Sequence, residues 1–412
     1  MASNRSEYAG KVSASGRQTR VLQSFRSESQ PDSRFPIVVH SHLRWSFVWQ
    51  RPQQIHSRLA RRHPILFVEE PLIEEGMEGD RLDVTSSIEN LWIVQPRLAP
   101  GPDVEGRVCR LLRESGNGMF RPLFGGAVHW LYTPLMEPQI DQFASPRAIV
   151  YDCMDELSKF AMASPRLVEK EQQLLDRADV VFAGGPELGA AKARLHPNVQ
   201  VLGCGVDFQH FQKAVSATPA PDLAMLPAPR LGYIGVIDER LDYDLLRNLA
   251  RELPEATVVM IGPVVKIDPA MLPRERNIVY LGARDYSSLP EYLAGLDACL
   301  MPFAMNEASY YINPTKTLEY LASGKPVVST PVRDVVRQFR DVVHVVEANL
   351  FPAEVRRVLS GDRRDAAAGV ERARHASWDK TVANMELFTG IALAGRDRRS
   401  VRRSGHDARV TA

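Results

Sequence analysis

Short runs of β-branched and aromatic residues alternate with amphipathic stretches along most of the chain. Residues 35–40 and 64–69 form two such apolar runs and are predicted to be buried strands, with a helix over 53–62 between them. The same alternation predicts strands at 127–132, 148–151, 180–183 and 199–202, and a helix at 165–177. Strands and helices in this order indicate a parallel sheet covered by helices on both faces.

A segment rich in Pro and Ala, residues 214–229, interrupts this pattern and is typical of a linker between domains. The alternation then restarts, with strands predicted at 230–235, 257–261, 278–281, 298–301 and 326–329, and helices at 243–251, 289–295 and 315–323. The predicted fold class is therefore α/β, with two Rossmann-like, doubly wound parallel-sheet domains that face each other across a cleft. Ligands of such sheets bind at the carboxyl ends of the strands.

The two ends of the chain lack the large apolar residues that would offset the entropy of ordering them. The predicted organisation is a disordered tail at 1–34, an N-terminal domain at 35–213, a linker at 214–229, a C-terminal domain at 230–375, a helix at 376–394 and a disordered tail at 395–412. The second tail is rich in arginine, so weak attraction to an anionic membrane surface is an alternative to simple solvation.

Composition limits the classes of function. The 412 residues include 51 basic and 50 acidic ones, and this balance calls for no nucleic-acid partner. Four scattered cysteines form no CxxC pair, so neither a disulfide framework nor a metal site is expected. No apolar run has the length of a transmembrane segment and the N-terminus lacks the apolar core of a secretion signal, which together predict a cytoplasmic protein.

The most informative segment for chemistry is residues 313–329, NPTKTLEYLASGKPVVS. Pro314 opens a helix, so backbone amides near Thr315 and Thr317 are predicted to point at a bound diphosphate, with Asn313 just before them. Lys316 adds a positive charge there. Glu319 follows one turn later on the same helix face and is expected to accept hydrogen bonds from the hydroxyls of a ribose.

This segment resembles the nucleotide-sugar motif of the group 1 glycosyltransferases, retaining enzymes of the GT-B fold. Glu319 matches the second Glu of that motif, and Pro314 with Lys316 matches a form in which Pro-x-Lys precedes it. The position of the first Glu holds Tyr311. Residues 204–207, CGVD, resemble the end of the family's N-terminal domain, so the resemblance extends over about residues 35–393.

Residues 231–235, LGYIG, resemble the first strand of the family's C-terminal domain and place Gly235 at the donor site. Family members usually carry an Arg and a Lys just after this strand, to neutralise the donor diphosphate. Here Val236 occupies the Arg position, and the resemblance leaves Arg240 as the preferred second phosphate ligand and Lys266 as a weaker one.

The resemblance implies a role for each part of the predicted cleft. Lys316 and Arg240 would stabilise the departing diphosphate as the bond to the sugar breaks. The resemblance implies a reaction that needs no metal and no other cofactor. The resemblance further implies retention at the anomeric carbon, an acceptor bound by the N-terminal domain, and a last helix that packs back on that domain.

The loop after the first predicted strand, residues 41–54, is dense in groups that bind sugars. His42, Arg44, Trp45 and Arg51 are the candidate acceptor-binding residues, because sugar rings stack on aromatic faces and accept hydrogen bonds from cations. Burial of the tryptophans in the core is the structural alternative. This arrangement resembles bacterial group 1 transferases that act on cell-envelope polysaccharides.

Asp152 and Asp155 follow the strand predicted at 148–151, so they are expected near the cleft. There they are candidate catalytic carboxylates, able to bind sugar hydroxyls or to stabilise positive charge at the anomeric carbon. Family members often have a His in this neighbourhood. Capping of the following helix is the structural alternative for either acid.

These features predict transfer of a hexosyl group from a nucleoside-diphosphate sugar, UDP- or GDP-linked, to a glycan or lipid-linked acceptor of the cell envelope. The expected location is the cytoplasm, including peripheral association with the inner face of the cell membrane. A sugar-nucleotide epimerase of the same architecture and an inactive, transferase-like binding protein are the alternatives. A dinucleotide-dependent enzyme is excluded because no predicted strand is followed by GxGxxG.

Overall fold

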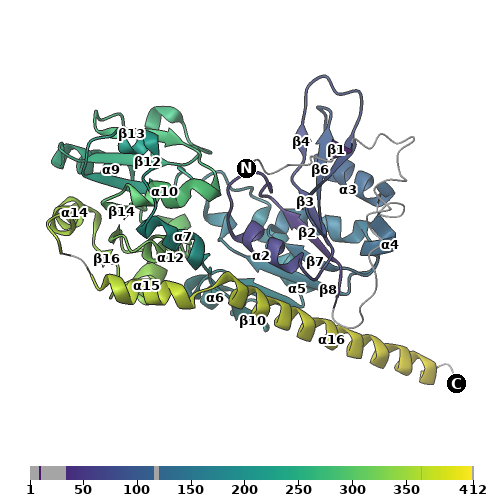
Figure 1. Cartoon of the computed structure of the whole chain (residues 1–412). Coiled ribbons are helices and arrows are strands. Elements are labelled where there is room, and N and C mark those ends of the chain that lie inside the picture. The colour runs from purple at the N-terminus through teal and green to yellow at the C-terminus, as the bar shows by residue number, and fades with distance from the viewer. Residues whose placement is uncertain (1–8, 11–33, 116–119, 363, 411–412) are drawn as a thin grey trace.

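The computed structural model describes residues 9–10, 34–115, 120–362 and 364–410, with side chains described to residue 396. Figure 1 shows two α/β domains side by side, the N-terminal one in purple and blue and the C-terminal one in green, with a long yellow helix running beneath the N-terminal domain. The predicted fold class is confirmed, since each domain contains a sheet whose central strands are parallel.

The N-terminal sheet has a parallel centre and an antiparallel edge. Its parallel strands lie in the order β6 (Leu91–Leu98), β3 (Ile65–Glu69), β2 (Ile37–Ser41), β7 (Val128–Leu131), β8 (Ala148–Cys153), β9 (Val180–Ala183) and β10 (Val199–Val201). At the edge, β5 (Arg81–Ile88) pairs antiparallel with β6 and with β1 (Ala9–Gly10), while β4 (Leu72–Ile73) pairs parallel with β6. The pattern of apolar residues does not predict this edge, because much of β5 is exposed and carries polar residues.

Helices cover both faces of this sheet, as continuous burial of its strands requires. The α-helices are α2 (Arg51–Leu59), α3 (Val104–Ser115), α4 (Arg121–Phe124), α5 (Leu167–Arg177) and α6 (Pro186–Lys192), with 3-10 turns η2 (Pro134–Gln142) and η3 (Leu157–Lys159). Alternate residues of one strand enter different cores: Val39 of β2 packs with Phe67 and Trp130, while Val38 packs on the other face.

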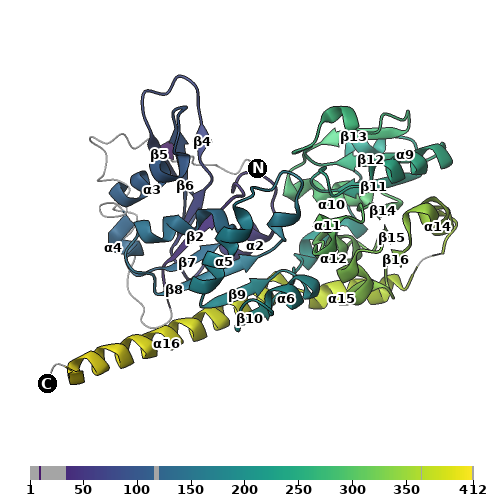
Figure 2. The ribbon, with the colours of Figure 1, turned by 180° about the vertical axis from the view of Figure 1, so that it is seen from behind.

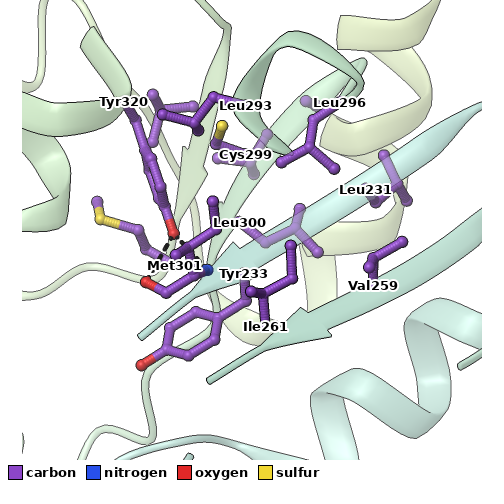
Figure 3. Packing of buried hydrophobic residues seen from close by; sticks show 14 of the residues in the cluster. Leu231, Tyr233, Val259, Ile261, Leu293, Leu296, Cys299, Leu300, Met301 and Tyr320 are labelled. Carbon is purple, nitrogen blue, oxygen red and sulfur yellow. Dashed lines mark hydrogen bonds between the residues drawn. The ribbon is translucent and has the colours of Figure 1, made fainter. Parts of the chain in front are cut away.

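The C-terminal sheet is entirely parallel over the described residues. Its order is β13 (Ile278–Gly282), β12 (Thr257–Ile261), β11 (Arg230–Ile234), β14 (Ala298–Met301), β15 (Val327–Ser329) and β16 (His344–Val345). The flanking helices are α9 (Tyr243–Glu252), α10 (Leu289–Ala294), α11 (Glu307–Tyr310), α12 (Lys316–Ala322), α13 (Arg333–Phe339), α14 (Phe351–Leu359) and α15 (Ala366–His375), with 3-10 turns η5 (Pro269–Met271), η6 (Tyr286–Ser288) and η7 (Ala348–Leu350). Side chains of Leu231, Val259, Leu300 and Tyr320 meet in its core (Figure 3).

The chain joins the C-terminal core earlier than the sequence predicts. Helix α7 (Phe208–Gln212) lies within the stretch assigned to the N-terminal domain, yet Phe208 and Phe211 belong to the same core as β11. The predicted linker itself contains most of the 3-10 turn η4 (Lys213–Val215) and the short helix α8 (Pro221–Ala224). The division at residue 213 therefore does not coincide with the division between the cores, because α7 buries its phenylalanines in the second domain.

The last helix, α16 (Trp378–Val410), leaves the C-terminal domain after α15 and lies along the N-terminal domain (Figure 2). Trp378 is buried at its start, in the same cluster as Trp130 and Phe182 of the N-terminal sheet. The helix continues to Val410, whereas the sequence predicts a disordered tail from residue 395. The other predicted tail, 1–34, lies outside the described residues except for Ala9, Gly10 and Arg34.

Candidate functional site

Helix α12 is held against the end of strand β11 by a buried tyrosine. Tyr320 accepts a hydrogen bond of 2.8 Å from the backbone amide of Ile234, and Figure 3 shows this contact at the strand end. The residue after Ile234 is Gly235, so the N-terminal turn of α12 lies beside the carboxyl end of β11. This is the position where parallel sheets bind their ligands.

Gly235 leaves room for Lys316. A Cβ atom added at Gly235 would lie 2.9 Å from Cε of Lys316, and the φ of +152° is unfavourable for other residues. Gly262 ends the neighbouring strand β12 with a φ of +147°, and a Cβ there would lie 1.9 Å from the carbonyl oxygen of Gly235. The two glycines therefore allow the ends of β11, β12 and the side chain of Lys316 to pack closely together.

The ammonium of Lys316 lies in a half-buried, partly aromatic environment. Its Nζ is 5.2 Å from the ring centre of Tyr233 and 5.3 Å from that of Phe303. Burial, and then the nearby charge of Arg240, lower the pKa of Lys316, while burial raises the pKa of Glu319 one turn away. Both changes in pKa favour the neutral form of the group, so an anionic ligand beside Lys316 would stabilise the charged form of the lysine.

Arg240 approaches Lys316 from the loop after β11. Asp238 fixes its guanidinium through hydrogen bonds of 3.0 Å from Nε and 2.6 Å from Nη2. This pairing orients the planar group in the way that bidentate pairs do. The charge of Arg240 lowers the pKa of Lys316, so the second cation predicted from the sequence lies near the first.

The N-terminal domain contributes Asp155 to the group of charged residues around Lys316 and Arg240. It lies just beyond β8, half-buried, and burial raises the pKa of its carboxyl group while Arg240, Arg51 and Lys316 act in the opposite direction. Those three cations come from both domains. The structure therefore assembles one carboxylate of the N-terminal domain and two cations of the C-terminal domain where the domains meet.

Asp152 has a different environment from Asp155. It is completely buried and forms an ion pair with Arg51, whose Nη2 lies 2.9 Å from its Oδ1. Trp130 donates a 3.3 Å hydrogen bond to Oδ2, and Arg51 also donates to the carbonyl of Leu202. Asp152 and Arg51 therefore hold α2, β7 and β8 together beneath the surface, and this burial does not fit the direct substrate contact predicted for either residue.

Hydrogen bonds fix the side chains of Asn313, Thr315 and Thr317. The amide of Asn313 donates to the carbonyl of Gly184 at 2.9 Å, and Thr315 donates to Sγ of Cys204 at 3.2 Å, so both reach the N-terminal domain. Thr317 is buried, its hydroxyl is 3.4 Å from Sδ of Met301, and its amide bonds to the carbonyl of Pro314. The expected free amide at Thr317 is therefore occupied within the helix.

A cleft of about 850 Å³ opens between the domains next to this cluster. The N-terminal domain lines it with Trp45, Ser46, Phe47, Val48, Trp49, Ser86 and Ser87. The C-terminal domain lines it with Ile234, Gly235, Ile261, Gly262, Pro263, Ala283, Arg284, Asp285, Tyr286 and Leu289. Its size and mixed polarity suit a ligand larger than a monosaccharide.

The aromatic residues of the loop after β2 divide between core and cleft. Trp45 is 7% exposed, its amide donates to Glu69 at 2.7 Å, and its indole donates to Ser87 at 2.9 Å. Trp49 is more exposed and its ring lies 5.9 Å from that of Tyr286 across the cleft. Trp45 therefore shapes the wall, and Trp49 is the tryptophan that meets the opposite domain.

His42 and Lys266 face one another from the two domains. Burial, and then Lys266, lower the pKa of His42 to about 4, and its Nδ1 is buried without a hydrogen-bond partner among the described residues. Lys266 is exposed, with a φ of +56°. Arg44 is also exposed on the same loop as His42. His42 and Arg44 belong to the N-terminal domain and Lys266 to the C-terminal domain, so the three candidates do not share one wall.

Several residues that line the cleft could not be predicted from the sequence, because they belong to no motif or predicted element. Tyr286 follows β13 in a 3-10 turn, and its hydroxyl accepts a 2.9 Å hydrogen bond from Gln54 of the other domain. Ser86 and Ser87 come from the strand β5, which the hydrophobic pattern does not reveal. Arg284 is held by Asp222 at 2.7 Å. Only the packing of separate segments places these residues at one surface.

The described residues contain no group of three or more His, Cys, Asp or Glu side chains placed to hold a metal ion. Within the same residues, no helix is both long and apolar enough to cross a membrane.

Comparison with known proteins gives consistent matches. Residues 228–360 match the family model of "Glycosyl transferases group 1". Over 283 residues the chain is 24% identical to the putative teichuronic acid biosynthesis glycosyltransferase TuaH of Bacillus subtilis, covering 62% of this chain and 70% of that protein.

Solved structures agree in fold. Sucrose-phosphate synthase of Thermosynechococcus elongatus superposes with a TM-score of 0.67 at 16% identity, covering 88% of this chain and all of the other. An E. coli chain described as trehalose-6-phosphate, bound with UDP-2-fluoro glucose, gives a TM-score of 0.64 at 12% identity, covering 87% of this chain and 99% of that one. At these identities the structural likeness supports the GT-B fold alone.

Proposed function

Since the chain is a group 1 glycosyltransferase with the GT-B fold, we propose that it transfers a hexosyl group from a nucleoside-diphosphate sugar to a glycan or lipid-linked acceptor of the cell envelope. The observation that carries the proposal is the convergence of Lys316, Arg240 and Asp155 from two domains beside Gly235. A UDP- or GDP-sugar is the proposed donor. The UDP-sugar analogue bound to the E. coli neighbour supports the first of these.

The donor diphosphate binds between Lys316 and Arg240 in this proposal. Cleavage of the bond from sugar to phosphate leaves negative charge on the diphosphate, and two fixed cations in a partly buried site stabilise it without reorganisation of water. Glu319 receives the ribose hydroxyls, and Gly235 with Gly262 lets the ligand approach the strand ends. These cations supply the charge in a metal-independent reaction.

Asp155 acts on the sugar side of the same bond. Positive charge develops at the anomeric carbon in the transition state, and a carboxylate of the N-terminal domain can stabilise it or bind a sugar hydroxyl. Asn313 and Thr315 contribute by joining the helix α12 to the N-terminal domain, which brings Asp155 and Lys316 to one place. We propose retention of configuration at the anomeric carbon, on the strength of the family resemblance.

The acceptor is proposed to enter along the N-terminal wall, past His42, Arg44 and the exposed edge of Trp49. Burial lowers the pKa of His42 to about 4, and a neutral imidazole ring can both donate and accept a hydrogen bond with a sugar hydroxyl. A cell-envelope acceptor is supported by the likeness to TuaH. Such an acceptor places the enzyme in the cytoplasm or at the inner face of the cell membrane.

The experiment that tests this proposal measures the release of nucleoside diphosphate from a panel of UDP-, GDP- and dTDP-sugars, with and without a membrane extract as the source of acceptor. Release that depends on acceptor supports transfer. Conversion of the sugar with no release would instead indicate the epimerase, and nucleotide binding without turnover would indicate a binding protein.

Single-residue variants, measured in the same assay, test where the donor diphosphate binds. Arg240→Ala should lower kcat/KM by about 100-fold or more, because it removes one of two cations from the departing diphosphate. Arg276→Ala is the matched control, since Arg276 is exposed on the same domain and lies just before β13, at the amino end of the parallel strands and opposite to their carboxyl ends. Equal activity of the two variants would place the diphosphate elsewhere.

A further inference from the structure

The exposed face of helix α16 differs from an ordinary solvent-facing helix surface. The opposite face is buried against the N-terminal domain through Val382, Met385 and Leu393. On the outer face, Leu387 is 58% exposed and Ile391 is 57% exposed, and they lie four residues apart, so they are neighbours on one side of the helix. A soluble helix normally carries polar residues at such positions.

We propose that this face of α16, the outer row, binds an anionic membrane surface. The outer row comprises the positions within about 60° of Leu387 when the helix is followed at 3.6 residues per turn. Among the residues whose side chains are described these are Lys380, Ala383, Asn384, Leu387, Gly390, Ile391 and Ala394. This part of the row contains small and apolar residues, one amide and one lysine, and no acidic residue.

The two acids in the part of this helix with described side chains form ion pairs on other sides of it. Asp379 is 3.1 Å from Nε of Arg58, and Glu386 is 2.9 Å from Nε2 of His63, so both pair with the helix α2 or the turn after it. Arg396 points to the domain as well, at 2.9 Å from Asp179. Ion pairs thus hold the inner side of the helix and leave the outer row without a negative charge.

Charge along the chain fits a negatively charged partner. Residues 387–412 carry six arginines and two aspartates, a net charge of +4, although the whole chain is only +1. Residues 1–386 together are therefore −3. An anionic membrane attracts such a basic end and repels the rest of the chain weakly, which would orient the protein with α16 against the lipid.

A helix that binds at a membrane interface needs both exposed apolar residues and positive charge. Apolar side chains enter the boundary between headgroups and acyl chains, and basic residues contact anionic lipid, whereas either feature alone gives weak binding. A second copy of the chain is a poorer occupant of the outer row, because a parallel pair would bring together two chain ends that each carry a net charge of +4 over residues 387–412. This inference rests on the proposed function in one respect: a membrane-held acceptor gives the contact its use.

The test is co-sedimentation of the full chain with vesicles made of phosphatidylcholine alone or of an equal mixture with phosphatidylglycerol. Binding is expected only to the anionic vesicles and should decrease as salt increases. The double variant Leu387→Glu with Ile391→Glu should lower the partition coefficient by about tenfold or more. Arg398→Glu with Arg402→Glu should reduce it as well and weaken its salt dependence.

A matched control separates the outer row from added charge in general. Leu350→Glu with Met225→Glu changes two apolar residues that are 53% and 81% exposed on the C-terminal domain, and it should bind vesicles as the wild type does. Equal loss in both double variants would overturn the proposal. So would equal binding to both kinds of vesicle, or a dimer in light scattering that the Leu387 and Ile391 variant abolishes while no vesicle binding is seen.

Release of nucleoside diphosphate, measured in solution, keeps this proposal distinct from the catalytic one. The Leu387 and Ile391 variant should release nucleoside diphosphate from the donor at the wild-type rate with a water-soluble acceptor or with water. If the wild type binds vesicles and releases no nucleoside diphosphate from any donor, the proposed function is wrong and the proposed membrane contact is supported. If release occurs without vesicle binding, only the proposed membrane contact is wrong.

Discussion

The two walls of the cleft are built in different ways. On the C-terminal wall, Lys316 and Glu319 come from one turn of one helix, and the backbone of β11 and β12 lies directly beneath them. On the N-terminal wall, the candidate residues come from separate loops, and some of them are buried: Arg51 and Asp152 pair with each other under the surface. A local motif thus gives a local site, whereas a wall made of distant segments mixes residues that face the ligand with residues that support them.

The largest effect expected from this contrast is on stability. Asp152→Ala should lower the free energy of unfolding by about 3–5 kcal/mol, because it leaves the guanidinium of Arg51 buried without its partner. Asp155→Ala, three residues later and half-buried, should change unfolding little and reduce kcat instead. Urea unfolding together with steady-state kinetics measures both. A soluble, stable Asp152→Ala protein that lacks activity would show that Asp152 acts on the substrate.

On the C-terminal wall, Lys316→Ala should lower kcat/KM by about 100- to 1000-fold with little loss of stability, because its charge acts on the diphosphate. Lys213→Ala, an exposed lysine near the start of the linker, is the control. Donor titration by calorimetry separates binding from chemistry. If the kinetics of both Lys316→Ala and Glu319→Ala were unchanged, the donor would not bind at this helix.

The pH dependence of donor binding should differ from that of an exposed lysine site. The pKa of Lys316 is lowered, so in the free enzyme its charge is lost at a lower pH than usual, and KM for the donor should rise by up to about tenfold as pH increases through that range. Lys316→Arg should keep its charge and flatten the rise. A wild-type KM that stays constant up to the ordinary pKa of lysine would contradict this environment.

The smallest effect concerns the support of the C-terminal wall. Tyr320→Phe removes the hydrogen bond between α12 and Ile234, which should cost about 1 kcal/mol of unfolding free energy and raise KM for the donor severalfold. Tyr292→Phe, which loses a 3.1 Å hydrogen bond to Asp222 away from α12, serves as the comparison. The two variants should differ in KM more than in stability.

Much of the fold was predictable because burial on both faces of a parallel sheet produces continuous apolar runs. The strands β9 and β12 agree residue for residue with the predicted ranges, at 180–183 and 257–261. The hairpin of β5 and β6 was missed because β5 lies at an edge and carries exposed polar residues. The extension of α16 to Val410 was missed because its apolar content is low there and composition suggested a tail.

For the site, the sequence determined the pair of Lys316 and Glu319, since two residues one helical turn apart must share a face wherever the helix lies. It could not decide which of Asp152 and Asp155 reaches the cleft. Nor could it find Tyr286, which meets Trp49 only after the two domains have packed. Local periodicity is a property of the backbone, whereas burial, pairing and exposure at a domain interface depend on segments that are hundreds of residues apart.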